Sequence, residues 1–170
     1  GYARNADAHK RVMRKHQAAN DSLRTMHSTD VAVHRLATQA WADVIKGGVS
    51  GNYSLEGGGG ADTLIGGGGD TSFRVSLGGG ASIIGGGGVN SLSFGNFSGG
   101  AIGDSAFANM TGIQTLGLYG YGTMSAASVT LGSNSATAGI VTVDGQGYSP
   151  GVTVNAAARS NAVTLKGGSG

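Results

Sequence analysis

The fold of this 170-residue chain is decided by residues 57–93, GGGGADTLIGGGGDTSFRVSLGGGASIIGGGGVNSLS. The stretch can be divided into blocks of nine residues, with one spare residue at Val75. The eighth residue of each block is large and apolar. The frame reaches back through residues 48–56, and the anchors are Leu55, Leu64, Phe73, Ile83 and Leu92. A fixed period with a glycine half and an apolar anchor is typical of a stacked β-coil. The sequence therefore predicts a mainly β chain, a glycine-rich β-solenoid whose anchors form one inward-facing column.

The same frame predicts that the anchor position and the sixth position of a block respond differently to a charge. The sixth residue varies among Tyr, Asp, Thr, Ala, Asn and Gly. On this interpretation Phe73→Asp unfolds the coil, whereas Thr71→Asp is tolerated.

Residues 57–65, GGGGADTLI, fit the GGxGxDxUx nonapeptide, and the chain resembles the RTX (repeats-in-toxin) β-roll proteins over residues 48–102. The resemblance implies calcium held between rungs by glycine carbonyls and the sixth-position aspartate. Only Asp62 occupies that position, and Asp70 is displaced from it by one residue. The two are therefore candidate calcium ligands of a weak site, and we expect no cofactor to be required.

Composition divides the chain near Lys46. Residues 1–50 hold three Lys and five Arg against four Asp, whereas residues 51–170 hold three basic against five acidic residues. Only one of the 35 glycines precedes Gly47. We predict three parts: an α-helical segment at 1–46, the RTX-like coil at 47–102, and a continuation of the solenoid at 103–170.

Residues 1–46 are predicted to anchor the protein to a partner or to copies of itself. Apolar or small residues recur in steps of three and four from Val12 to Val44, which favours one long helix or two helices with a break near residue 28. We expect contact with copies of itself or with an acidic protein surface. The predicted contact residues are Lys10, Arg11, Val12, Arg14, Lys15, Leu23, Met26 and Val33.

Residues 103–170 are predicted to continue the stack of strands, with a longer repeat than nine residues. Short β-branched segments occur at 112–120, 128–132, 139–145, 151–156 and 162–168, with Gly, Asn and Ser between them. Such spacing is typical of an all-β stack. We expect these strands to extend the solenoid.

The sequence holds no recognisable catalytic constellation. All four histidines lie before residue 47, and the carboxylates of the β region are scattered singly. No apolar run is long enough to span a membrane, and no nucleic-acid motif accompanies the basic residues. We therefore expect a non-enzymatic structural protein outside the cell, on a cell surface or in a virion: a phage fibre or decoration protein, or a bacterial surface layer or filament. The alternative is a calcium-binding RTX module of a type I-secreted protein.

Overall fold

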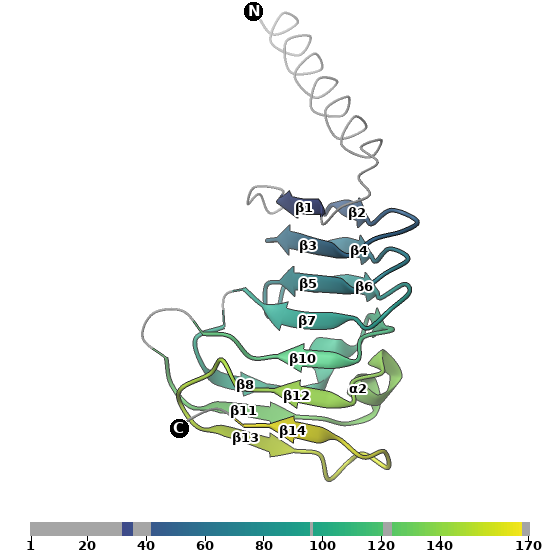
Figure 1. Ribbon diagram of the computed structural model, residues 1–170. Coiled ribbons are helices and arrows are strands. Elements are labelled where there is room, and N and C mark those ends of the chain that lie inside the picture. Colours follow the sequence, from purple (N-terminus) through teal and green to yellow (C-terminus); the bar gives the residue numbers. More distant parts are fainter. Residues whose placement is uncertain (1–31, 36–41, 96, 121–123, 168–170) are drawn as a thin grey trace, which may run out of the picture.

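The computed structural model describes residues 42–95, 97–120 and 124–167, together with the backbone of residues 32–35. These residues form a β-solenoid whose rungs are stacked along one axis (Figure 1). The prediction of a mainly β solenoid is confirmed.

The rungs are built from short strands separated by glycine-rich turns. The strands are β1 Ala32–Arg35, β2 Val44–Lys46, β3 Tyr53–Gly58, β4 Thr63–Ile65, β5 Thr71–Val75, β6 Ser82–Ile84, β7 Ser91–Phe94, β8 Gly100–Ile102, β9 Met110–Thr111, β10 Thr115–Gly117, β11 Ala127–Thr130, β12 Thr142–Asp144, β13 Val152–Asn155 and β14 Thr164–Lys166. Two short helices interrupt them, the 3-10 helix η1 Asp104–Phe107 and the α-helix α2 Ser133–Ala138.

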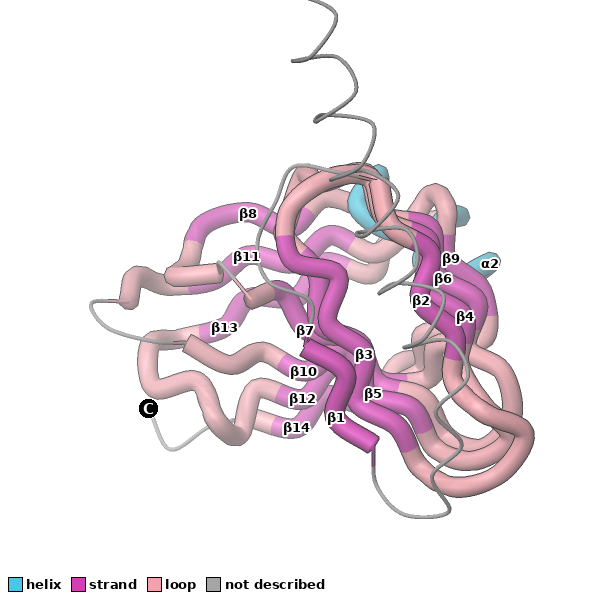
Figure 2. The backbone as a smooth tube through the Cα atoms, turned by 90° about the horizontal axis from the view of Figure 1, so that it is seen from above, coloured by secondary structure: helices cyan, strands magenta, loops and turns pink. Residues whose placement is uncertain are grey.

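Three parallel sheets run along the stack. Sheet A has the order β1-β3-β5-β7-β10-β12-β14, sheet B the order β2-β4-β6-β9, and sheet C the order β13-β11-β8. Viewed from above, sheet A lies between the other two (Figure 2). The rungs nearest the N-terminus use sheets A and B, and those nearest the C-terminus use sheets A and C.

The anchors form two columns, so the expectation of a single column is wrong. In sheet A, Leu55 pairs with Phe73, and Phe73 with Leu92; in sheet B, Leu64 pairs with Ile83. All five side chains are at most 1% exposed. Each block of nine is thus half a rung, and successive blocks contribute to opposite walls of one core.

The sixth position of the blocks also differs from expectation. Thr71 is 1% exposed and begins β5, where alternate residues face the core. Its hydroxyl oxygen accepts a hydrogen bond from Gly67 N at 3.3 Å. A charge at this position would be buried, so the prediction that Thr71→Asp is tolerated is wrong.

Strands replace helix in the described portion of residues 1–46. β1 pairs with β3, and β2 pairs with β4, each in parallel register. Val33 and Val44, which the sequence placed on a helical stripe, are strand residues. The helical prediction is therefore wrong for residues 32–35 and 44–46, where pairing with the next rung overrides the local pattern.

Candidate functional site

Asp62 lies at the corner that precedes β4 and is 1% exposed. Its Oδ1 accepts the backbone N–H of Asp43 from the neighbouring rung at 3.0 Å. Burial raises the pKa of Asp62; the hydrogen bond from Asp43 opposes the rise, and the negative charge of Asp43 adds to it. The carboxylate therefore ties two rungs together in a setting that disfavours its charged form.

Asp70 occupies a different corner, directly before β5, and is exposed. Its backbone N–H donates to Asn52 Oδ1 at 3.0 Å, and its own Oδ1 accepts from Val89 N at 2.8 Å. Side-chain oxygens thus link three successive rungs at this corner. Within the described residues, no three His, Cys, Asp or Glu side chains gather into a group that could hold a metal ion.

Asp104, which the sequence did not single out, caps α2. Its Oδ1 accepts from Gly132 N at 2.7 Å and from Ser135 N at 2.9 Å, and its Oδ2 accepts from Asn134 N at 2.9 Å. Burial raises the pKa of Asp104, but these backbone donors and the Ser135 hydroxyl outweigh it and leave the pKa below its ordinary value. The carboxylate satisfies N–H groups at the start of a helix that have no partner within the helix.

Stability is expected to depend on pH through Asp104. A pKa that is lower in the folded state means that the ionised form stabilises the fold; this stabilisation is complete above the unfolded pKa and is lost as pH falls through the folded pKa. Asp104→Asn is expected to cost about 1–2 kcal/mol at pH 7. Urea unfolding between pH 2 and 7 checks this, because the variant should lose less stability than the natural protein below pH 4. Equal pH profiles would contradict the assignment.

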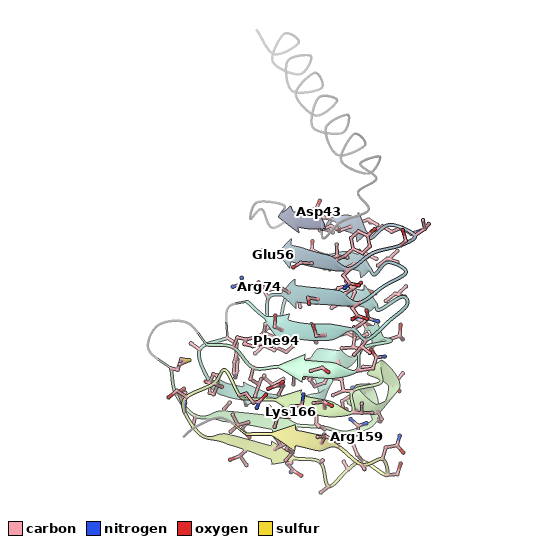
Figure 3. All side chains as sticks on the ribbon, in the orientation of Figure 1. Asp43, Glu56, Arg74, Phe94, Arg159 and Lys166 are labelled. Atoms are coloured by element: carbon pink, nitrogen blue, oxygen red, sulfur yellow. The ribbon has the colours of Figure 1, made fainter. Side chains whose placement is uncertain are left out.

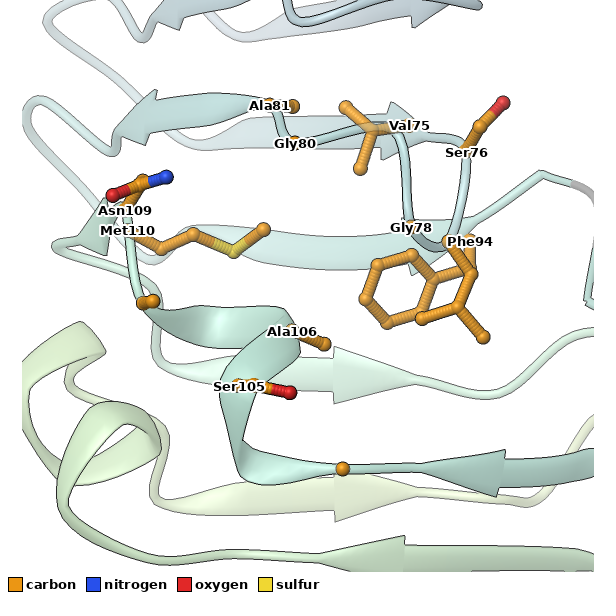
Figure 4. Close-up of a pocket in the computed structure, with 13 residues that line it drawn as sticks. Val75, Ser76, Gly78, Gly80, Ala81, Phe94, Ser105, Ala106, Asn109 and Met110 are labelled. Atoms are coloured by element: carbon orange, nitrogen blue, oxygen red, sulfur yellow. The ribbon is translucent and has the colours of Figure 1, made fainter.

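A surface cavity of about 310 Å³ opens where sheet B gives way to sheet C (Figure 4). It lies between the turn that follows β5 and the helix η1. Its lining is mostly apolar or small, and includes Val75, Phe94 and Met110, with polar groups from Ser76, Ser105 and Asn109. The lining has no ionisable side chain, so the cavity can bury apolar surface but cannot supply an acid or a base.

Figure 3 shows Glu56, Arg74 and Lys166 on the stack, and charged side chains of described sheet A strands form two ion pairs. Arg74 Nη1 lies 3.9 Å from Glu56 Oε1, and Lys166 Nζ lies 3.7 Å from Asp144 Oδ2. Pairs this exposed contribute about 0–1 kcal/mol each. Among the side chains that the structure describes, these two pairs balance one positive against one negative charge each.

The anchor predicted in the first part of the chain lies outside the described residues, except for Val33, which is placed by its backbone in β1. The residues concerned are Lys10, Arg11, Val12, Arg14, Lys15, Leu23 and Met26. Among the helices that the structure describes, none is long and apolar enough to cross a membrane.

Comparison with known proteins finds short stretches of similarity to enzymes. The chain is 51% identical over 53 residues to a vitamin B12-dependent ribonucleotide reductase of Streptantibioticus cattleyicolor, which is 31% of this chain and 9% of that protein. The reductase of the same name from Streptomyces clavuligerus is 42% identical over 53 residues, and that of Streptomyces avermitilis 44% over 45 residues. The chain thus spans 5 to 9% of the length of these relatives. No family model matches the chain, and no solved structure matches it.

These similarities overturn the expectation of a non-enzymatic structural protein, whether fibre, surface layer or filament. The curated proteins that the chain resembles are enzymes. The error has a physical origin: absence of a catalytic constellation in one chain does not exclude an enzyme whose active site is built from a much longer polypeptide.

Proposed function

We propose that this chain acts in vitamin B12-dependent ribonucleotide reduction, in association with a longer reductase polypeptide. The similarity that carries the proposal is the stretch of 53 residues, 51% identical to the reductase of Streptantibioticus cattleyicolor. A stretch of that length is at the lower limit of a domain. We therefore assign the chain an accessory part in the reaction.

The roles of the described carboxylates support an accessory part. Asp62, Asp70 and Asp104 each accept hydrogen bonds from backbone N–H groups of other rungs or of α2. Carboxylates held in this way stabilise the stack and are poorly placed to transfer protons during a reaction. The described residues then contribute binding surface to the larger assembly.

The test mixes the purified 170-residue chain with the reductase of Streptantibioticus cattleyicolor. Sedimentation velocity measures the complex, and the rate of vitamin B12-dependent ribonucleotide reduction is measured with and without an equimolar amount of the chain. We expect a complex and a change in rate of about twofold or more; an unrelated protein of similar mass serves as control. Absence of both effects would refute the proposed function.

The RTX resemblance and its calcium site remain a separate proposal. We expect millimolar Ca²⁺ to stabilise the chain by less than about 1 kcal/mol, because a weak single site near its dissociation constant contributes little. Thermal unfolding with calcium and with a chelator measures the effect, and Asp62→Asn should remove the small stabilisation that calcium gives. Calorimetric titration that revealed several tight sites, or folding only with calcium, would contradict this prediction.

We also propose a location for the protein and a contact for its N-terminal residues. Residence outside the cell, on a cell surface or in a virion rests on the repeat sequence alone, and cell fractionation tests it.

Contact of the basic N-terminal residues with an acidic protein surface, or with copies of the chain, rests on their charge. Charge reversal at Arg11, Arg14 and Lys15 should weaken such contact in a salt-dependent way.

A further inference from the structure

A row of hydroxyl side chains runs along the outer face of sheet A, across strands that lie one above another in Figure 1. Backbone pairing places five residues of β3, β5, β7, β10 and β12 in register: Ser54, Ser72, Ser91, Thr115 and Thr142. Each directly precedes a residue of the sheet A core column that is at most 1% exposed. Successive residues of a strand face opposite sides of the sheet, so the row faces away from the core. None of its five residues is buried.

The row combines a regular repeat with available hydrogen-bonding groups. Neighbouring strands of a sheet lie about 4.8 Å apart, so the hydroxyls recur at that interval along the stack. Ser91 Oγ donates to Ser72 Oγ at 3.2 Å. Within the part of the chain that the structure describes, the hydroxyls of Ser54, Thr115 and Thr142 have no hydrogen-bond partner. Since each hydroxyl can donate one hydrogen bond and accept two, the row suits a ligand that repeats and carries both donors and acceptors.

Tyr119 adds an aromatic surface beside the row. A Cβ on Gly117 would lie 2.6 Å from Tyr119 Cε2, and a Cβ on Gly147 would lie 3.0 Å from Tyr119 Cδ1. The ring therefore packs against two residues that have no side chain to displace it. Gly117 ends β10, two residues after Thr115 and on the same side of the sheet. Tyr119 is nevertheless 51% exposed, so its ring offers a platform on which a ligand can stack.

The charged side chains that the structure describes on sheet A are balanced. Glu56, Arg74 and Asp144 each lie two residues after a member of the hydroxyl row. Glu56 is paired with Arg74 at 3.9 Å, and Asp144 with Lys166 at 3.7 Å. A face with equal numbers of both signs gives no preference to a polyanion or a polycation. These charges therefore favour an uncharged ligand.

We propose that the outer face of sheet A binds a neutral, straight polysaccharide of the cellulose or chitin type, laid along the hydroxyl row. Sugar hydroxyls both donate to and accept from the row, and the C–H face of one sugar ring stacks on Tyr119. Chains of this type are straight ribbons and can follow a straight row, whereas amylose-type chains coil away from it. The proposal does not depend on the function proposed above.

The probes are two soluble hexasaccharides, cellohexaose and its N-acetylated counterpart chitohexaose. Maltohexaose, an amylose-type chain of the same composition as cellohexaose, is the matched control ligand. Binding to the isotope-labelled full chain is followed by NMR at the amides of β5, β7, β10 and β12 and at the ring of Tyr119. We expect at least one of the two probes to produce saturable shifts that are confined to this face, and maltohexaose to bind about tenfold more weakly.

Variants separate the contribution of the ring from that of the hydroxyls. Tyr119→Ala should weaken binding about tenfold, whereas Tyr119→Phe keeps the ring and should stay within about twofold of the natural chain. The double variant Thr115→Val and Thr142→Val keeps the β-branched shape, removes two hydroxyls and should weaken binding about tenfold. The matched control is Thr63→Val in β4, which lies in sheet B and should leave the affinity unchanged.

Four results would overturn the proposal. Two concern the ligands: neither probe binds at millimolar concentration, or maltohexaose binds as tightly as the better probe. The third is a set of shifts that lies on other faces of the molecule. The fourth is an equal loss of affinity from Thr63→Val and from the double variant. Circular dichroism confirms that each variant keeps the fold, because none of the substituted residues is buried.

Discussion

Replacing Phe73 by Asp is expected to unfold the solenoid. Phe73 is 1% exposed and stacks between Leu55 and Leu92 in the sheet A column. Loss of a buried phenylalanine costs about 3–5 kcal/mol, and a carboxylate placed in the same apolar column adds the cost of burying a charge without a partner. The sum is comparable to the whole stability of a domain, about 5–15 kcal/mol. Far-UV circular dichroism at 25 °C should show loss of β signal.

The matched control is Ser72→Asp, one residue earlier in the same strand. Ser72 is exposed, because alternate residues of β5 face opposite sides of sheet A. This change should alter stability by no more than about 0.5 kcal/mol. A similar loss from both variants would mean that the column does not form the core.

The periodic apolar anchors made the core predictable from the sequence. Each anchor repeats at the eighth position of a block, and the five anchor side chains are all buried. The period alone does not say how many blocks complete one rung. Tyr53 pairs with Thr71, eighteen residues further on, so two blocks close one turn. Only this pairing separates the anchors into two facing columns and turns Thr71 inward.

The helix cap at Asp104 and the strands β1 and β2 could not be predicted from the sequence, because they depend on contacts between distant residues. Asp104 caps α2 across 28 to 31 residues, and no local motif links the two segments. The stripe that predicted helix through Val33 and Val44 is short of large apolar residues. In strands β1 and β2 these residues gain hydrogen bonds to the following rung, which a local pattern does not reveal.

The similarity to reductases was equally hidden from motif analysis. Motif reasoning searches for groups that converge on one reaction centre, and the described carboxylates instead bind backbone N–H groups. The similarity covers a stretch of 53 residues, which is 31% of the chain. Such a relationship emerges from comparison with whole sequences.

Replacing Gly66 by Ala is expected to destabilise the stack by about 3 kcal/mol, although only a methyl group is added. Gly66 is buried, and its N–H donates to Ile84 O of the next rung at 2.7 Å. A Cβ on Gly66 would overlap the carbonyl oxygen of Gly85 and lie 2.7 Å from its carbonyl carbon. Both atoms belong to backbone, which cannot rotate away, so the two rungs must separate and weaken the adjoining hydrogen bonds. Thermal and urea unfolding measure the loss.

Gly59→Ala is the matched control and should act in the opposite direction. A Cβ on Gly59 would meet no atom within 4 Å, and the φ angle of Gly59 lies outside the left-handed region. Alanine there restricts the unfolded chain and should stabilise the protein by about 0.4–1 kcal/mol. Opposite signs for the same chemical change would show that close approach between rungs, rather than glycine content as such, determines where this chain requires glycine. Equal destabilisation by the two variants would instead mean that backbone flexibility is needed throughout the glycine runs, and the tight spacing of rungs at Gly66 would not be the cause.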